Sequence, residues 1–500
     1  MTPARRQLVG LLQLRWVMVR SRGVRTLLLL SLLLVGYLAY AIARSGNDLE
    51  QAKVATAVEL APVAFLGFVV LAVIAPLTAG GGNEVFPPDQ LVAFPIRPRT
   101  QFLGGLALAP LNLVWVLQLL TLTAETAFVS RGGSGWRAAA TATGYVVCAT
   151  VLGQALSWWV AGLRQTRTGR RALTVLAVAA VGGSVLAIRF GLGHVIVERT
   201  PTRTLVHAVA ARPDELTRWA VTTCALLALI AAGLWLGTAL CGWALRRPTD
   251  TTARVDLGPV RRRTARTGPL AELVAVNRAS AWRAPALRRG GLVLAILPGI
   301  GAAGAGVPWE SLTILPGLVA AGAGLLFGVN AFALDGSGAL WMASLPHRPR
   351  LVALAKVLVL AETVAAAVFL AALAGGVRSP GSPTPSQLSA IVFSGLACTA
   401  VVVAVCLSSS VRRPHHALLR SPRDSIAPPG ALALASLKLS APAAMVGLLF
   451  SGAAQSGLVW VPPLLAVPVV ALAVLSVLRS LATYDQPLPR ARVVSVVSAG

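Results

Sequence analysis

The stretch "MASLPHRPRLVALAKVL", residues 342–358, lies between two long apolar runs and repeats a pattern found much earlier, "VAFPIRPRTQFLGGLAL", residues 92–108. Both stretches contain Pro-x-Arg-Pro-Arg, and the two copies lie 251 positions apart. An acidic residue precedes the first proline of each copy by eleven positions, Glu84 in the first and Asp335 in the second. Agreement in motif, spacing and upstream acid predicts that the chain is a duplication of one unit.

The composition of the chain is that of a membrane protein. Of its 500 residues, 56% are hydrophobic and 12% are charged, whereas a water-soluble domain has roughly a quarter charged residues. The net charge of +27 comes from arginines in short loops between apolar runs. Cytoplasmic loops of a multi-pass protein account for such arginines better than nucleic-acid binding does. We therefore expect a cytoplasmic (plasma) membrane protein with no nucleic-acid partner.

Apolar runs of about 20 residues predict an all-α polytopic protein with twelve transmembrane helices. The predicted spans are 26–43, 57–80, 101–123, 138–162, 172–193, 219–245, 290–307, 312–334, 352–376, 387–409, 430–452 and 457–478. The first is interpreted as an uncleaved span, because about 25 arginine-containing residues precede it and many spans follow. Pro308 and Glu310 leave only a short turn within 290–334, so this pair could instead be one re-entrant element.

The spans divide the chain into two predicted membrane units. Residues 1–245 form the first six-span unit, 246–289 a basic cytoplasmic linker, and 290–500 the second six-span unit with a short cytoplasmic tail. An even number of spans in each unit makes them parallel repeats and places both termini in the cytoplasm. The linker's arginines would be attracted to anionic headgroups by about 1 kcal/mol each. Its second part, from about Leu270, could hold an interfacial helix.

One loop departs from the expected charge asymmetry. Residues 195–218 would lie outside the cell and yet contain four arginines, partly offset by acidic residues. We interpret this loop as a small extracellular cap, with a short helix from about Leu205 to Ala211.

The repeated motif has the chemistry of a docking loop. Two prolines stiffen the turn and remove backbone donors, and arginines offer rigid forks for carboxylates. Such a loop at the cytoplasmic end of two spans could receive force from a soluble partner. The alternative is that its arginines only anchor helix ends at the headgroups. The candidate docking residues are Glu84, Pro95, Arg97, Arg99, Asp335, Pro346, Arg348 and Arg350.

The chain resembles a known family in "FGVNAFALDGSGALWMASLPHRPRLVALAK" (Phe327 to Lys356), in "PPDQLVAFPIRPR" (Pro87 to Arg99) and in its six-plus-six layout. These features resemble the membrane subunits of type-2 ABC exporters in their fused form, particularly permease-like proteins of high-GC actinobacteria. The resemblance implies that Glu84 to Arg99 and Asp335 to Arg350 couple to an ATP-binding subunit. It also implies an interfacial helix before the first span, which residues 4–20 could supply.

Catalytic motifs are missing from the sequence. A P-loop needs Gly-Lys-Ser/Thr, and none of Lys53, Lys356 and Lys438 follows a glycine. ATP with Mg²⁺ would therefore bind a separate P-loop ATPase subunit, and we expect neither enzyme activity nor a cofactor in this chain. His415 and His416 are adjacent but lack further ligands at suitable spacing, so no metal is predicted.

Glu362, deep in the ninth span, could line a substrate path or pair with Lys356. The apolar spans favour a hydrophobic or amphipathic substrate, and the resemblance implies that it is exported. One alternative is a proton-coupled carrier of the major facilitator type, but the loop after span two lacks that family's Gly-x-x-x-Asp-Arg-x-Gly-Arg-Arg-like pattern. Another is a membrane scaffold or sensor subunit that transports nothing.

Overall fold

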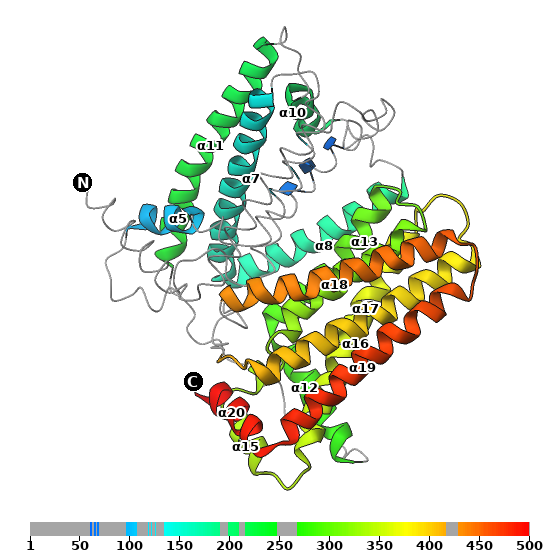
Figure 1. The fold of residues 1–500 in the computed structure, drawn as a ribbon. Coiled ribbons are helices and arrows are strands. Elements are labelled where there is room, and N and C mark those ends of the chain that lie inside the picture. Colours follow the sequence, from blue (N-terminus) through cyan, green and yellow to red (C-terminus); the bar gives the residue numbers. More distant parts are fainter. Residues whose placement is uncertain are drawn as a thin grey trace. The chain divides into compact units, whose positions relative to one another are not determined.

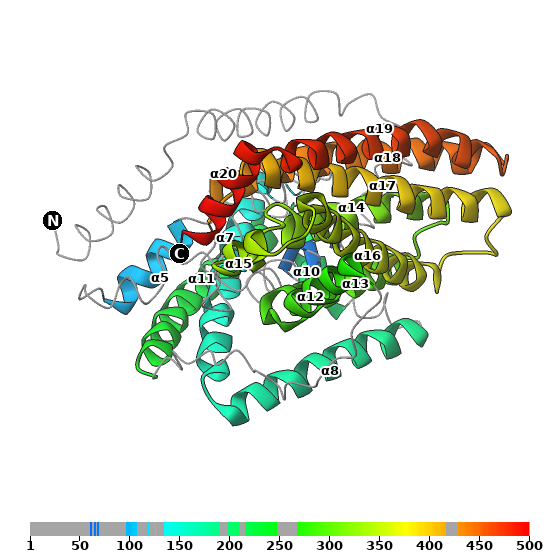
Figure 2. The ribbon, with the colours of Figure 1, turned by 90° about the horizontal axis from the view of Figure 1, so that it is seen from below.

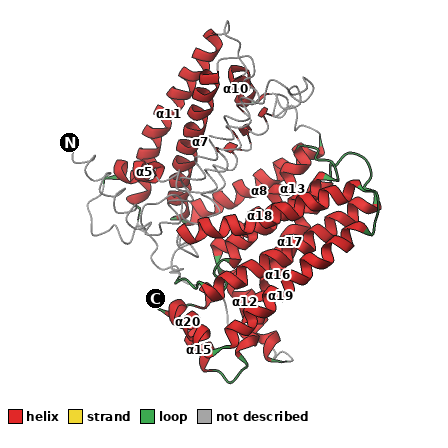
Figure 3. Cartoon of the chain, viewed as in Figure 1, coloured by secondary structure: helices red, strands yellow, loops and turns green. Residues whose placement is uncertain are grey.

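The computed structural model describes residues 97–107, 135–190, 199–209, 216–247, 268–416 and 429–499, with a few positions between 61 and 126. Every regular element in these ranges is a helix (Figure 3). The chain divides into two compact units, Met1–Thr251 and Thr252–Gly500. Each unit is described by itself below (Figure 1). The all-α prediction is therefore confirmed for the described residues.

The first unit is built around two long helices that lie side by side. Its helices are α5 (Pro98–Ala107), α7 (Gly135–Arg164), α8 (Arg167–Arg189), α10 (Pro201–Val209) and α11 (Leu216–Leu245). Helices α7 and α11 pack along their length, and the ring of Phe102 from α5 fills the space where Gly237 has no side chain. The predicted span 26–43, and most of 57–80 and 101–123, lie outside the described residues.

A short helix lies in the loop that we expected to form a cap. It runs from Pro201 to Val209, about two to four residues earlier than predicted, because a proline suits the first turn of a helix. Leu205 and Val206 are buried in a cluster that includes Tyr145 and Cys148 of α7. The loop is therefore folded onto α7 rather than extended from it.

The second unit contains a helix for each predicted span from 290 onward. A fifteen-residue helix precedes these spans, a helical run of mixed type forms the second span, and two short helices follow span ends. The elements are α12 (Pro269–Arg283), α13 (Pro285–Gly304), η3 (Ser311–Ile314), α14 (Leu315–Ala323), η4 (Gly324–Gly328), η5 (Ala333–Asp335), α15 (Gly338–Ser344), α16 (Pro349–Gly376), α17 (Pro385–Arg412), α18 (Pro429–Gln455), α19 (Val461–Asp485) and α20 (Pro487–Ser498).

The ambiguous region 290–334 forms two separate helices. Gly290 faces Leu326 and Gly322 faces Leu294, so α13 and the run that follows it are antiparallel neighbours. This arrangement is a helical hairpin; its interpretation as two complete spans stays a prediction, as does the re-entrant alternative.

Seven helices of the described chain are long and apolar enough to cross a membrane. They are α7, α11, the run Ser311–Asp335, α16, α17, α18 from Leu434, and α19. Helices α12 and α13 pass the same test only together and are bent by 83°, which would raise the number to eight. The structure thus supports a membrane-embedded protein, and the count of twelve stays a prediction.

Two pairs of helices that would correspond under the predicted duplication pack in the same way in each unit, and the duplication itself stays a prediction. The helix after the motif begins at Pro98 in the first unit and at Pro349 in the second, which are again 251 positions apart. Helix α7 packs most extensively against α11, and α17 packs most extensively against α19 (Figure 2). Helix α5 contacts α11, as α16 contacts α19. A duplication of one unit predicts this agreement.

Small residues let the helices of the second unit approach closely. A Cβ on Gly317 would lie 2.5 Å from the backbone oxygen of Ala443, and one on Gly328 would lie 2.3 Å from the Cys406 sulfur. Buried hydroxyls add hydrogen bonds between helices: Ser394 Oγ donates to the Thr313 carbonyl at 2.8 Å. Close packing and such hydrogen bonds hold helices together where lipid removes the hydrophobic driving force.

Candidate functional site

Most of the described cations of the second unit lie near one end of its helix bundle, which we call the arginine end. The run Ser311–Asp335, α17 and α19 finish there, and α16 begins there. Their terminal side chains share a core with α12, α15 and α20. The cations near this end that the structure describes include Arg348, Arg350, Lys356, Arg412, Arg413, Arg490 and Arg492.

The opposite end of the second unit is nearly free of positive charge. Of its three loops, residues 305–310, 377–384 and 456–460, only the second has a cation, Arg378. Hydrogen bonds connect these loops to one another and to the start of α17, such as that from Trp309 Nε1 to the Gly381 carbonyl at 3.1 Å. The strong charge asymmetry is therefore a property of the folded unit.

The second copy of the motif lies at the arginine end with its cations exposed. Arg348 caps the N-terminus of α16, and its carbonyl accepts the Leu351 N–H at 2.9 Å. Arg350 and Pro346 are also exposed. Since Pro349 has a fixed φ and no N–H, it starts the helix without losing a hydrogen bond. The motif thus points two arginines into solvent from a rigid helix start.

The first copy has the same local structure where the chain is described. Arg97 and Arg99 are exposed on either side of Pro98, and the Arg97 carbonyl accepts the Gln101 N–H at 3.1 Å. Glu84 and Pro95 lie outside the described residues. Both motifs therefore open a helix with proline between two exposed arginines.

The candidate docking residue Asp335 faces inward. Its Oδ1 lies 2.5 Å from Lys356 Nζ, and the two side chains are only 10% and 6% exposed. This ion pair joins the end of the run Ser311–Asp335 to the second turn of α16. Asp335 therefore positions the loop rather than contacting a partner, whereas Arg348 and Arg350 remain available.

Glu362 is paired with a residue that the sequence did not suggest. Arg278 of α12 donates from Nε to Glu362 Oε2 at 2.7 Å, and a second bond joins Arg278 Nη2 to Oε1. Both side chains are about half exposed. The suggested Glu362–Lys356 pair is wrong, because Lys356 turns toward Asp335 on another face of α16. Glu362 instead fixes α12 on α16, at the position expected for an interfacial helix.

The backbone just before Asp335 is irregular and is held by α17. The run passes through the π-helical turn η4, and Ser410 Oγ donates to the Gly328 carbonyl at 3.1 Å and accepts the Ala331 N–H at 3.0 Å. Asn330 Nδ2 donates to the His415 carbonyl at 2.6 Å. Non-helical backbone at a membrane span needs such partners. The motif loop is thus tied to the end of α17.

Local burial also sets the charge state of the loop after α17. Burial, helped by the charge of Arg413, lowers the pKa of His415 below that of a free histidine. This histidine is neutral at neutral pH, and the positive charge of the arginine end comes from its arginines.

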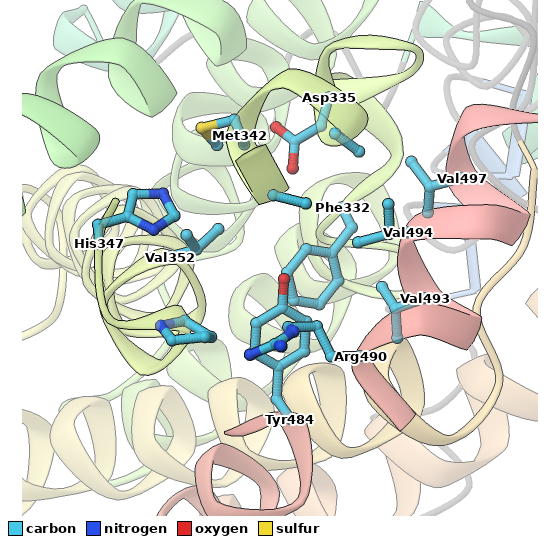
Figure 4. Close-up of a pocket in the computed structure, with 13 residues that line it drawn as sticks. Phe332, Asp335, Met342, His347, Val352, Tyr484, Arg490, Val493, Val494 and Val497 are labelled. Carbon is cyan, nitrogen blue, oxygen red and sulfur yellow. The ribbon is translucent and has the colours of Figure 1, made fainter. Parts of the chain in front are cut away.

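A cavity of about 160 Å³ lies between the motif loop and the end of the chain (Figure 4). Phe332 and Tyr484 stack with ring centroids 5.0 Å apart, and Arg490 lies beside them. Both ring nitrogens of His347 are buried without a hydrogen bond among the described residues. The cavity therefore has a mixed lining, in which Asp335, His347, Tyr484 and Arg490 lie among apolar side chains.

The last helix, α20, was missed by the sequence analysis, which expected only a short tail. Val493 and Val497 are about 1% exposed and pack with Phe332 and Val352. The apolar spacing of 493 and 497, one helical turn apart, was the signal for a helix that packs on one face. The chain end is thus part of the arginine end.

Comparisons with known proteins give no match: no family model, no curated protein and no solved structure matches this chain. The described residues also contain no group of three or more His, Cys, Asp or Glu side chains that could hold a metal ion. The function must therefore be argued from the geometry of the two units and the arginine end.

Proposed function

We propose that this chain is the membrane-spanning permease subunit of an ATP-driven, ABC-type transporter, energised by a separate P-loop ATPase subunit. We further propose that it exports a hydrophobic or amphipathic substrate. One observation carries the proposal: two motifs 251 positions apart each start a helix at a proline and each expose two arginines. Two matching, rigid and positively charged helix starts suit two copies of one soluble partner.

The distribution of charge supports a cytoplasmic position for these motifs. Loops rich in arginine stay on the cytoplasmic side of a membrane, and the opposite loops of the second unit carry only Arg378 among described cations. A cytoplasmic arginine end is exposed to the compartment that contains ATP.

The contacts around the second motif favour transmission of force. A partner that pushes on Arg348 or Arg350 pushes on α16 directly, because these residues form its first turn. The buried Asp335–Lys356 pair and the Ser410 hydrogen bonds extend that connection to the preceding span and to α17. A displacement at the loop therefore reaches three spans.

The buried charges of the second unit argue for ATP rather than a proton gradient as the driving force. A proton-coupled carrier needs titratable groups along its path. Within the described spans, the buried Asp335 and Lys356 neutralise each other at the arginine end, and Glu362 pairs with Arg278. The described spans also contain Lys438, which is exposed, and are otherwise apolar away from their ends, which suits an apolar substrate.

Affinity purification from native membranes in mild detergent tests the proposal. We expect the tagged chain to retain a P-loop ATPase, identified by mass spectrometry, and the fourfold charge reversal of Arg97, Arg99, Arg348 and Arg350 to glutamate to release it. Arg378→Glu, at the opposite end, is the matched control and should retain the ATPase. A wild-type chain that brings no ATPase, under conditions that preserve a known ABC complex, contradicts the proposal.

A further inference from the structure

Helix α20 and the short helix α15 pack against each other at the arginine end. Both leave large apolar side chains outside: Trp341 of α15 is 78% exposed and Leu488 of α20 is 83% exposed. Leu340 and Leu345, next to Trp341, are more than half exposed as well. Large exposed apolar side chains gathered in one short segment, as in and beside α15, mark a candidate interaction site.

Contact with lipid tails does not account for these side chains. Helix α15 lies beyond the last residue of one span and α20 beyond the last residue of another, so both cap the bundle's end rather than its sides (Figure 1). The sides of a bundle face lipid, whereas its end faces the aqueous phase. A soluble protein is thus the occupant that fits best.

We propose that α15 and α20 form one composite docking surface, so that the C-terminal helix is a second contact for the ATPase subunit beside the motif loop. The inference rests on the proposed function. Trp341 and Leu488 supply its apolar part, and Trp and Arg are the residues most often found in the energetic centre of protein interfaces.

The charge of this surface defines the partner's chemistry. Arg348 and Arg350 follow α15 in the chain, Arg490 and Arg492 belong to α20, and Asp485 is the one exposed acid in residues 336–350 and 485–499. The complementary face is therefore an apolar groove with an acidic rim. The cavity beside His347 and Arg490 can take one projecting side chain of the partner.

Site-specific photo-cross-linking in the full chain tests this inference. A benzophenone amino acid is placed at Trp341, at Leu488, and at Trp460, which is 59% exposed in a loop of the opposite end. We expect the probes at 341 and 488 to cross-link the same P-loop polypeptide in native membranes, and the probe at 460 not to. Leu488→Glu should reduce ATPase recovery at least tenfold, while Leu458→Glu, at the opposite end, should leave it unchanged.

The outcomes separate this inference from the proposed function. If the probe at 341 captures the ATPase while the probe at 488 captures only lipid or nothing, the composite surface is wrong and the permease proposal stands. If the wild-type chain retains no ATPase at all, the proposed function itself fails. Removal of residues 487–500 is a poor test, because it uncovers the core around Val493 and Val497.

Discussion

The buried Asp335–Lys356 pair gives the sharpest prediction about how the motif loop is held. At 2.5 Å and an effective dielectric constant of about 20, two unit charges attract by about 7 kcal/mol before desolvation is counted. Removing one partner of such a buried pair leaves the other charge uncompensated and destabilises by about 3–5 kcal/mol. We therefore expect Lys356→Met and Asp335→Asn each to destabilise the second unit by this amount.

The double variant distinguishes an ion pair from two independent contributions. Asp335→Asn with Lys356→Met leaves no buried charge, so it should be more stable than either single variant by about 2 kcal/mol. Because unfolding in detergent is rarely reversible, the assay is the apparent Tm from the monodisperse fraction on size-exclusion chromatography after heating. A loss of 3–5 kcal/mol corresponds to a Tm decrease of roughly 6–20 °C in a unit of this size.

The half-exposed Arg278–Glu362 pair is the matched control. Glu362→Gln keeps a neutral acceptor for Arg278 and removes one charge of a half-exposed pair, so it should lower the apparent Tm less than the variants of the buried pair do. The reasoning is refuted if the single variants at 335 and 356 melt like wild type, or if their effects add fully in the double variant.

Three further predictions concern packing, backbone support and sidedness. Gly317→Ala should destabilise the second unit by about 1–3 kcal/mol, because the added Cβ would meet a backbone oxygen of α18. Gly301 faces open space, so Gly301→Ala should be neutral or stabilising by up to about 1 kcal/mol in the same melting assay. Equal melting of the two variants contradicts this packing. Ser410→Ala should destabilise the second unit by about 1–3 kcal/mol, because the backbone around Ala331 would lose its hydrogen bonds to the Ser410 hydroxyl. A variant with the wild-type Tm would show that the irregular turn needs no such support. Single cysteines at Ser344 and Ser456 should react with an impermeant maleimide from opposite sides of the membrane, the first from inside; labelling of both from one side would overturn the topology.

The sequence was sufficient to predict the helices of the second unit and the helix that starts after each motif. Long apolar runs and a proline in a first turn determine structure locally, without distant partners. The sequence was insufficient to predict the ion pairs. Asp335 contacts Lys356 only when two spans pack together, and Glu362 pairs with Arg278, which lies 84 positions earlier in the chain. The packed face of α20 was also missed, since two valines one turn apart in a short segment could equally have belonged to a tail. The exposure of Arg348 and Arg350 is consistent with the docking hypothesis, which stays a prediction.

The central claim is that one chain carries two docking loops and therefore binds two ATPase subunits. Native mass spectrometry of the complex purified in mild detergent measures this directly. The account predicts a particle with one copy of this 51.6 kDa chain and two copies of a P-loop ATPase. The chain alone, or a particle with equal numbers of chains and ATPase subunits, would contradict it.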